Sequence, residues 1–123
     1  MNTTNSYRDL IVWQKAIDLV TQLYKITNKF PREEIYGLTS QMRRSAVSIP
    51  SNIAEGRNRG TKKDYVQFLR IAYGSGAELE TQITICKRLK LIITAECIEI
   101  DSLLDEVMRM LNAMIRKLST PKS

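Results

Sequence analysis

The feature that most constrains the fold is a helical spacing of apolar residues, which recurs in four segments of the chain. In each segment the apolar residues follow at steps of three and four, which places them on one face of an α-helix. A length of 123 residues is typical of one domain. The sequence therefore predicts an all-α fold, an antiparallel up-and-down four-helix bundle forming a single domain over residues 1–123, with 1–8 and 119–123 as flexible termini.

The first two predicted helices are separated at Phe30-Pro31, because proline disfavours helix at the preceding residue and suits the start of the next helix. The first helix is expected from Asp9 to about Lys29. Its expected core residues are Trp13, Ala16, Ile17, Val20, Leu23 and Tyr24. In the second helix, Glu33 and Glu34 are expected in the first turn and Ile35, Leu38, Met42, Ala46, Ile49 and Ile53 in the core.

Proline at position 50 falls inside the second of these segments, yet the apolar spacing continues through it without a change of phase. A break there would make Ile49 the N-cap of a new helix, and isoleucine is a poor N-cap. One helix kinked at Pro50 is therefore favoured over two separate helices, although an internal proline costs about 3 kcal/mol unless its neighbours compensate.

Gly56 and Gly60 bracket a short basic loop, after which Thr61 is the expected N-cap of the third helix, with Asp64 in its first turn. Thr94 is the expected cap of the fourth helix. The expected core of the third helix is Tyr65, Phe68, Leu69, Ala72, Gly76, Leu79, Ile83, Cys86 and Leu89, and that of the fourth is Cys97, Ile100, Leu104, Val107, Leu111, Met114 and Leu118.

A narrow polar ridge follows from the spacing of Ser45, Ser48, Asn52 and Glu55, which share one face of the second helix. We expect this ridge to pack against the small residues 74–77 of the third helix, where missing side chains permit close approach. Ser45 and Ser48 are expected to bond the main-chain carbonyl that Pro50 leaves without a donor. The alternative is that these polar side chains are simply solvated.

Positive charge is concentrated in the centre of the sequence. The formal net charge is +6 with a pI near 9.5, which favours anionic partners. Residues 41–63 hold six cations against one acid, whereas residues 94–118 hold an excess of acids. The predicted nucleic-acid-binding residues are Arg43, Arg44, Arg57, Arg59, Lys62 and Lys63. Because no helix-turn-helix, zinc finger or RNA-binding aromatic motif accompanies them, an ordinary solvated surface is the alternative.

Several classes of function are disfavoured by composition. Without histidine, the commonest general base and the usual partner of a serine or cysteine nucleophile is missing. The carboxylates of Glu55, Glu78 and Glu80 are expected to form ion pairs with Arg43, Arg44 or Arg70 instead of an acid–base pair. Cys86 and Cys97 form no CxxC pair, so neither a disulfide framework nor a metal site is indicated. We therefore expect that the protein is not an enzyme and that it binds no cofactor and no metal.

The start of the chain lacks the basic and then apolar order of a signal peptide, and no apolar run is as long as a membrane span. These two observations predict a cytoplasmic protein.

The stretches YRDLIVWQKAIDLV, SIPSNIAEG and GSGAELETQ closely resemble a bacterial family, that of the 23S ribosomal RNA intervening-sequence protein, over roughly Tyr7 to Leu118. The resemblance implies a four-helix bundle similar to members that form homopentamers, barrel-like rings with a central channel, with no catalytic role attached to the motif. A related family, the accessory variability proteins of diversity-generating retroelements, binds nucleic acid and a reverse transcriptase. Gly76 is a mild departure from the family pattern. The residues expected to serve helix packing or oligomer formation are Ser45, Ser48, Pro50, Asn52, Glu55, Gly74, Ser75 and Glu78.

Two functions follow as hypotheses. The first is a non-enzymatic homo-oligomer, a pentamer by resemblance, that binds nucleic acid, RNA in preference to DNA, through the basic loop between the second and third helices. The alternative is a protein-interaction scaffold with no nucleic-acid role, whose positive charge only keeps it dispersed in solution.

Overall fold

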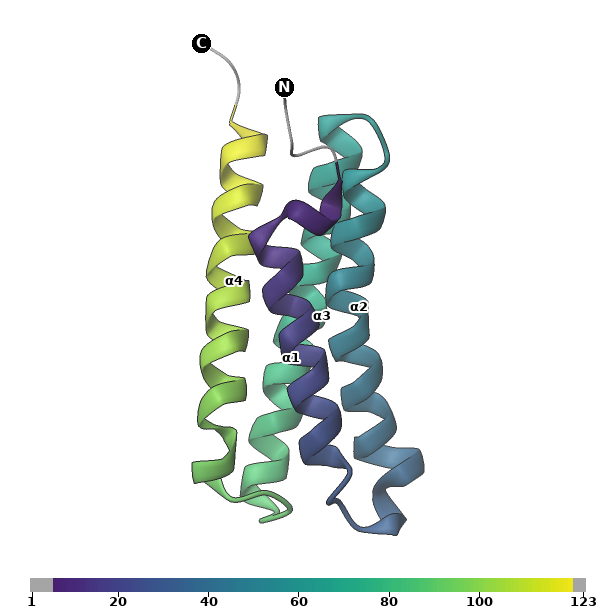
Figure 1. The fold of residues 1–123 in the computed structure, drawn as a ribbon, viewed down its shortest axis with the longest axis vertical. Coiled ribbons are helices and arrows are strands. Elements are labelled where there is room, and N and C mark those ends of the chain that lie inside the picture. The colour runs from purple at the N-terminus through teal and green to yellow at the C-terminus, as the bar shows by residue number, and fades with distance from the viewer. Residues whose placement is uncertain (1–5, 121–123) are drawn as a thin grey trace.

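The computed structural model describes residues 6–120 as an all-α antiparallel four-helix bundle, as the sequence predicts (Figure 1). The long helices are α1 (Ile11–Thr27), α2 (Ser40–Arg57), α3 (Lys62–Arg88) and α4 (Ile98–Ser119). Three short 3-10 helices, η1 (Tyr7–Asp9), η2 (Arg32–Glu34) and η4 (Thr94–Cys97), and one π-helical turn, η3 (Ile35–Thr39), complete the description. Most of the predicted flexible termini lies outside the described residues, although Tyr7 and Arg8 belong to η1 and Ser119 is the last residue of α4.

The topology places three chain segments at one end of the bundle: the start of α1, the loop between α2 and α3, and the end of α4 (Figure 1). The two remaining connections, from α1 to α2 and from α3 to α4, lie at the opposite end. None of the helices within residues 6–120 is both long and apolar enough to cross a membrane.

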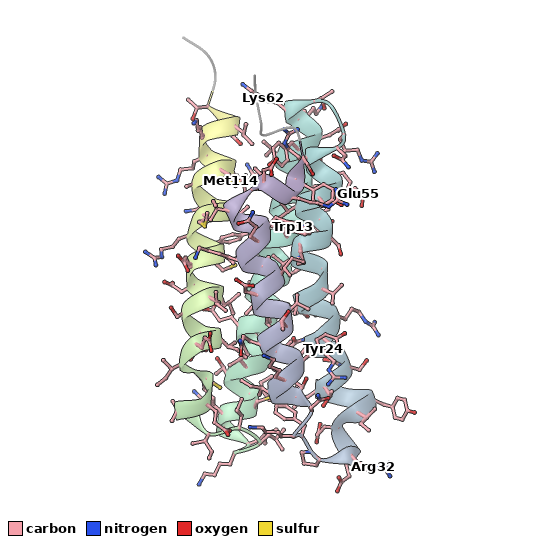
Figure 2. All side chains as sticks on the ribbon, viewed as in Figure 1. Trp13, Tyr24, Arg32, Glu55, Lys62 and Met114 are labelled. Carbon is pink, nitrogen blue, oxygen red and sulfur yellow. The ribbon has the colours of Figure 1, made fainter. Side chains whose placement is uncertain are left out.

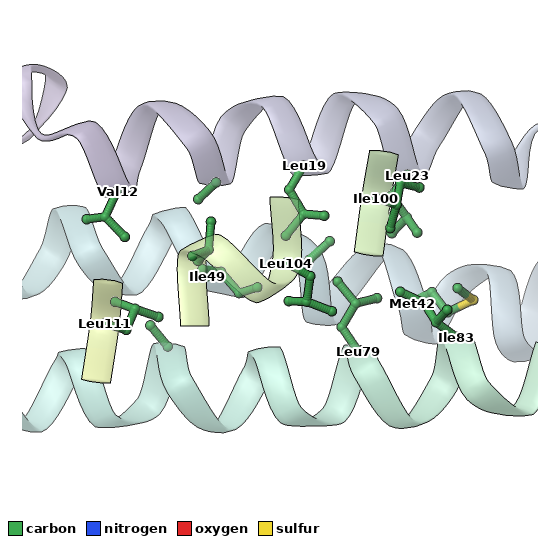
Figure 3. Close-up of a cluster of buried hydrophobic side chains, with 14 of the residues drawn as sticks. Val12, Leu19, Leu23, Met42, Ile49, Leu79, Ile83, Ile100, Leu104 and Leu111 are labelled. Carbon is green, nitrogen blue, oxygen red and sulfur yellow. The ribbon is translucent and has the colours of Figure 1, made fainter. Parts of the chain in front are cut away.

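The core runs along the length of the bundle and receives side chains from all four helices (Figure 3). Leu19, Ile49, Leu79 and Leu111 are among the side chains with almost no exposed surface. Burying a side chain of this size contributes about 1.5–3 kcal/mol. The predicted core residues of α3 and α4 are largely confirmed; Leu89, however, is exposed, and Ile115 is buried without having been predicted.

The predicted core face of α1 is partly wrong. Ala16 and Leu23 are buried as expected, but Val12 and Leu19 complete the inner face. The predicted residues Trp13 and Val20 are half-buried, while Ile17 is 37% exposed. The reason is that α1 carries apolar residues on two adjacent faces at the same helical spacing, so the period alone does not decide which face is inside.

The second helix begins later than predicted. Instead of continuing from Glu33, the chain forms η2 and then the π-helical turn η3, and α2 starts at Ser40. Gly37 has non-helical dihedral angles inside this turn, and Ile35, a predicted core residue, is 45% exposed. An apolar residue at the correct spacing therefore does not reach the core when the backbone between it and the helix is irregular.

The helix continues through Pro50, as predicted, and Pro50 itself is buried. A change of helix direction at this residue stays a prediction. The Ser48 hydroxyl does not serve the carbonyl that Pro50 leaves without a donor: its Oγ lies 2.7 Å from Ser75 Oγ of α3, and Asn52 Nδ2 donates to it at 2.9 Å.

Capping confirms one predicted helix start and corrects the other. Thr61 Oγ1 accepts a hydrogen bond from the Asp64 N–H at 3.1 Å, as expected of the N-cap of α3. Thr94 does not cap α4, because it is the first residue of the 3-10 turn η4, and α4 begins only at Ile98 without a side-chain cap.

The end of α3 is closed by a Schellman motif that has lysine in the position usually held by glycine. The Leu91 N–H bonds the Cys86 carbonyl at 3.0 Å, and the Lys90 N–H bonds the Lys87 carbonyl at 3.1 Å. Lys90 has a φ of 59°, in the left-handed region that disfavours residues with a Cβ. This turn therefore stores backbone strain.

Replacing Lys90 with glycine (Lys90→Gly) should raise the free energy of unfolding by about 0.5–1 kcal/mol, because the left-handed conformation no longer opposes a Cβ. Chemical denaturation measures the change. Arg88→Gly is the matched control, since it removes the same charge from a right-handed position in α3 and should lower stability by about 1 kcal/mol. Equal destabilisation by both variants would contradict the assignment of strain.

Both cysteines are buried, and their burial makes them chemically quiet. Burial, with the nearby Cys97 and Glu34 contributing, raises the pKa of the Cys86 thiol to about 11, and burial also raises the pKa of Cys97.

Because the thiolate is the reactive form, both cysteines should resist alkylation at pH 8 in the folded protein and react once it is unfolded in denaturant. Mass spectrometry after iodoacetamide treatment measures this, and rapid native labelling of Cys86 would contradict it.

Candidate nucleic-acid interface

The loop between α2 and α3 gathers cations at one end of the bundle. Arg59, Lys62 and Lys63 are exposed there, and Figure 2 shows Lys62 at the tip of this end. Because α4 runs toward the same end, its last turn brings Arg116 and Lys117 to it as well (Figure 1). Sequence reasoning assigned these two cations only to the helix dipole, although the antiparallel topology it predicted already placed them at this end.

Arg59 is held in a defined position. Its Nη2 lies 2.8 Å from Glu55 Oε2, and its guanidinium carbon is 4.8 Å from the centre of the Phe68 ring. Glu55 belongs to α2 and Phe68 to α3, so one acid and one aromatic ring fix the direction of the guanidinium. An exposed pair of this kind adds little stability, which makes orientation its main effect.

The loop closes tightly onto α3. At Gly56 an added Cβ would lie 2.6 Å from the Phe68 Cβ, so only glycine lets α2 and α3 approach this closely. A shallow hollow of about 180 Å³ lies against this contact and is lined by Gly56, Arg57, Gly60, Thr61, Lys62 and Tyr65. Burial raises the pKa of Tyr65, and the positive charge of Arg57 opposes that effect. The hollow combines main-chain and cationic groups that suit a phosphate.

Arg43 and Arg44, the other two predicted nucleic-acid-binding residues, are not part of this basic end. They lie near the start of α2, separated from Arg57 by about 20 Å at the helical rise of about 1.5 Å per residue. Figure 2 shows Tyr24, which Arg43 contacts, toward the opposite end of the bundle from Lys62.

Arg43 is bound to the end of α1. Its Nε donates to Thr27 Oγ1 at 2.9 Å, its Nη2 donates to Asn28 Oδ1 at 3.0 Å, and its guanidinium carbon lies 4.4 Å from the centre of the Tyr24 ring. These contacts join α1 to α2. Arg44, the next residue, is exposed.

A second hollow, of about 490 Å³, lies beside these arginines. Its lining is Tyr24, Ile35, Tyr36, Ser40, Arg43, Arg44 and Val47. Sequence reasoning named the two arginines and missed the tyrosines, because Tyr36 belongs to the irregular turn η3 and Tyr24 was assigned to the core. Tyr36 is 96% exposed, and an aromatic residue next to glycine between two helices was the signal available.

The residues of the predicted polar ridge make different contacts in the structure. Ser48 and Asn52 do meet Ser75 of α3, through the hydrogen bonds described above, and Ser45 is buried. Glu55 instead pairs with Arg59, just beyond the end of α2, and its side chain is exposed, so the expected packing against α3 is not formed; a contact of Glu55 with a neighbouring subunit stays a prediction.

The small residues 74–77 of α3 likewise have different neighbours. Gly76 faces α4, where an added Cβ would lie within 2.3 Å of Met108 Sδ, and it does not receive α2. Gly74 and Glu78 are exposed, and an added Cβ at Gly74 would meet nothing within 4 Å. The expectation that this segment as a whole receives α2 is therefore wrong.

The carboxylates weighed for acid–base chemistry do not converge. Glu55 pairs with Arg59, not with the predicted Arg43, Arg44 or Arg70, and Glu78 and Glu80 lie exposed on α3. Within residues 6–120, no group of three potential metal ligands comes together.

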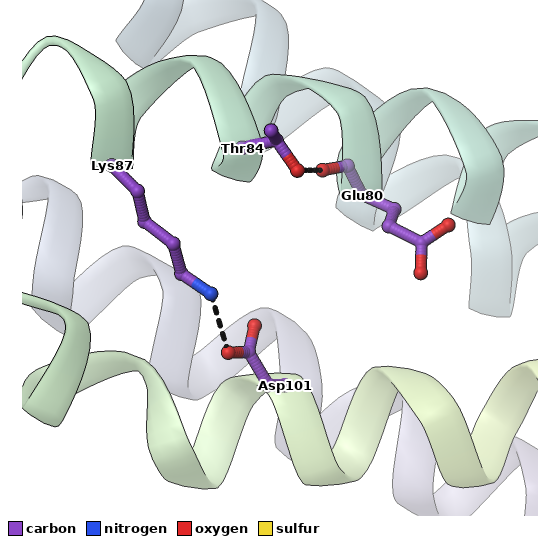
Figure 4. Close-up of polar contacts among 4 residues, drawn as sticks. All are labelled: Glu80, Thr84, Lys87 and Asp101. Carbon is purple, nitrogen blue, oxygen red and sulfur yellow. Dashed lines mark hydrogen bonds and ion pairs between the residues drawn. The ribbon is translucent and has the colours of Figure 1, made fainter.

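A polar hollow of about 200 Å³ between α3 and α4 is lined in part by Glu80, Lys87 and Asp101. Lys87 Nζ donates to Asp101 Oδ2 at 2.6 Å, while the Thr84 hydroxyl donates to the Glu80 main-chain carbonyl (Figure 4). The hydrogen bond to Asp101 raises the pKa of Lys87. A protonated, paired lysine is neither a base nor a nucleophile, so this hollow has the chemistry of a helix-to-helix ion pair.

An apolar groove of about 300 Å³ runs between α1 and α2. Trp13, Ile17 and Val20, which were predicted for the core, line one side, and Pro50 and Ala54 line the other. The ring of Tyr7 from η1 packs against Trp13, with 5.3 Å between the ring centroids, and closes one end.

Comparisons with known proteins agree with the helical architecture. The chain is similar to a protein of unknown function from the S23 ribosomal protein family of Bacteroides thetaiotaomicron, with a TM-score of 0.78 and 22% identity over 86% of this chain and 99% of that one, a likeness that shows the fold. No curated protein matches the chain. A model of the family described as 23S rRNA-intervening sequence protein matches residues 8–113. Because the match spans most of the chain, the chain belongs to the 23S rRNA-intervening sequence protein family.

Proposed function

We propose that this protein is a non-enzymatic, oligomeric RNA-binding protein of the cytoplasm, which contacts phosphates through the basic end formed by Arg57, Arg59, Lys62 and Lys63. The observation that carries the proposal is that this loop and the last turn of α4 lie at the same end of the bundle, which adds Arg116 and Lys117 to that end. Cations gathered on a rigid surface bind a polyanion by releasing its counterions.

The charge balance at this end supports a polyanionic ligand. Of the acids near the loop, Glu55 is paired with Arg59, and Asp64 occupies the first turn of α3, where the helix dipole favours a carboxylate. The two lysines Lys62 and Lys63 are exposed. RNA is chosen over DNA because the description of the matched family refers to 23S rRNA.

The absence of a catalytic role is part of the proposal. It is supported by the dispersed positions of Glu55, Glu78 and Glu80, by the pairing of Lys87 with Asp101, and by a sequence without histidine. An acid–base mechanism requires two such groups positioned around one substrate atom.

Oligomer formation is supported by Gly74. Inside a long helix, a glycine that faces open space lowers stability by about 1 kcal/mol relative to alanine and gains no packing within the subunit. A neighbouring subunit that approaches α3 closely at this point gives the glycine a function. A homopentamer, which the family resemblance implies, is the assembly that we propose.

The protein-interaction scaffold is the second candidate function, and the apolar groove between α1 and α2 favours it. Trp13 and Ile17 present apolar surface there together with Val47. Tryptophan in such a setting is typical of protein interfaces. In this alternative the basic end has no ligand, so the two functions differ in their response to RNA.

The double charge reversal Lys62→Glu/Lys63→Glu should lower RNA affinity by at least about tenfold and reduce the slope of log affinity against log salt by about two, since about two phosphate contacts are lost. Fluorescence anisotropy with a mixed RNA pool at several salt concentrations measures both. Arg88→Glu/Lys90→Glu, with the same change of net charge at the opposite end, should retain wild-type affinity. Equal losses in the two variants, or no RNA binding by the wild type, would contradict the proposed function.

Replacing Gly74 with glutamine (Gly74→Gln) should leave the subunit folded and convert the oligomer to a monomer, because the added side chain occupies the space that a neighbour needs. Sedimentation velocity measures the mass, and circular dichroism checks the helix content. Ala113→Gln, which adds a similar bulk to an exposed position of α4, should sediment as the wild type does. A Gly74→Gln protein with unchanged mass would remove Gly74 from the interface.

A further inference from the structure

The hollow between the end of α1 and the start of α2 combines the two kinds of side chain that bind single-stranded nucleic acid. Tyr36 is 96% exposed, so its ring is open to stacking, and a second ring, that of Tyr24, lines the same hollow. Arg43 and Arg44 supply positive charge beside them. Aromatic rings stack on the faces of unpaired bases, while cations bind the phosphates between those bases.

The charge of Arg43 is fixed in place and not neutralised. Its hydrogen-bond partners are the Thr27 hydroxyl and the Asn28 amide oxygen, both uncharged, and its guanidinium lies over the Tyr24 ring. No carboxylate lines the hollow; Glu34 precedes it in the chain and is not among its lining residues. A site with two cations and no acid among its lining residues favours an anionic occupant.

The outer face of α2 connects this hollow with the basic end. Between Arg44 and the loop, the one exposed acid on α2 is Glu55, which already pairs with Arg59. The distance from Arg44 to Arg57 is about 20 Å along the helix, which equals roughly six nucleotides at a stacked spacing of about 3.4 Å. A single strand of modest length therefore reaches both ends.

We propose that the Tyr36–Arg44 hollow stacks an unpaired base of single-stranded RNA, so that α2 carries a base-contacting site at one end and a phosphate-contacting site at the other. This inference rests on the proposed function and adds to it the class of ligand, unpaired RNA. It also assigns different tasks to the two ends: the loop provides salt-dependent affinity, and the hollow provides contacts that require bases.

The test compares two 12-nucleotide probes, an oligouridylate and a ribose-phosphate oligomer of the same length without bases. Tyr36→Ala should lower affinity for oligouridylate about tenfold, as loss of one stacked base does, and leave affinity for the abasic oligomer unchanged. Tyr36→Phe should retain wild-type affinity because it keeps the ring. Tyr73→Ala, at an exposed tyrosine of α3 outside the hollow, is the matched control and should change neither affinity.

The outcomes separate this inference from the proposed function. If Lys62→Glu/Lys63→Glu lowers the affinity for both probes and Tyr36→Ala lowers the affinity for neither, the basic end binds RNA and the stacking site is overturned. If Tyr36→Ala lowers the affinity for both probes equally, the tyrosine does not contact a base, and the inference also fails. If Tyr36→Ala sediments as a smaller species, the ring belongs to a subunit contact and the inference is again overturned. If the wild type binds neither probe, the proposed function itself fails.

Discussion

The packing of α2 against α3 is the constraint on which the rest of the structure depends. It is held at three heights: Gly56 against Phe68 beside the loop, Ser48 against Ser75 in the middle, and Met42 Sδ at 3.4 Å from Cys86 Sγ toward the far end. Because these contacts fix the two helices in register, the loop between them has little freedom. The cations of that loop are consequently presented as a rigid group.

This register also explains why polar residues are tolerated along an otherwise apolar seam. A hydroxyl taken out of water is costly unless it has a partner, and the half-buried Ser48 has two, Ser75 and Asn52. The pairing is directional, so it selects one sliding position of α2 on α3, whereas apolar contacts alone tolerate several. Polar contacts in this seam therefore specify alignment more than they add stability.

The helices, their order and their antiparallel arrangement were predictable because long amphipathic periods and loop signals such as Gly60 and Thr61 are local properties of a sequence. The inner face of α1 was not, because Ile17 and Leu19 are both apolar and only the partner helices decide between them. The start of α2 was missed for a different reason: the irregular turn at Gly37 leaves the apolar period unbroken while the backbone departs from a helix.

The candidate site shows the same limit. Cations within one loop, such as Lys62 and Lys63, remain neighbours in any fold, so their grouping was predictable. Whether Arg43 joins them depends on the length and straightness of α2, and its partners Thr27 and Asn28 lie across a connection that carries no periodic signal. The Tyr36 hollow depends on that same connection, which explains why sequence reasoning found its arginines but not its rings.

Under the proposed function, the separation of charge and rings along α2 determines which form of RNA fits the two sites. A duplex presents phosphates to a basic surface but keeps its bases stacked on one another, so it would engage the loop and leave Tyr36 without a partner. A single strand satisfies both ends, and the rigidity of α2 keeps the two ends at a fixed distance from each other. Under the proposed function, the Tyr36 hollow therefore selects unpaired over paired RNA, and α2 sets the spacing between the base contact and the phosphate contacts.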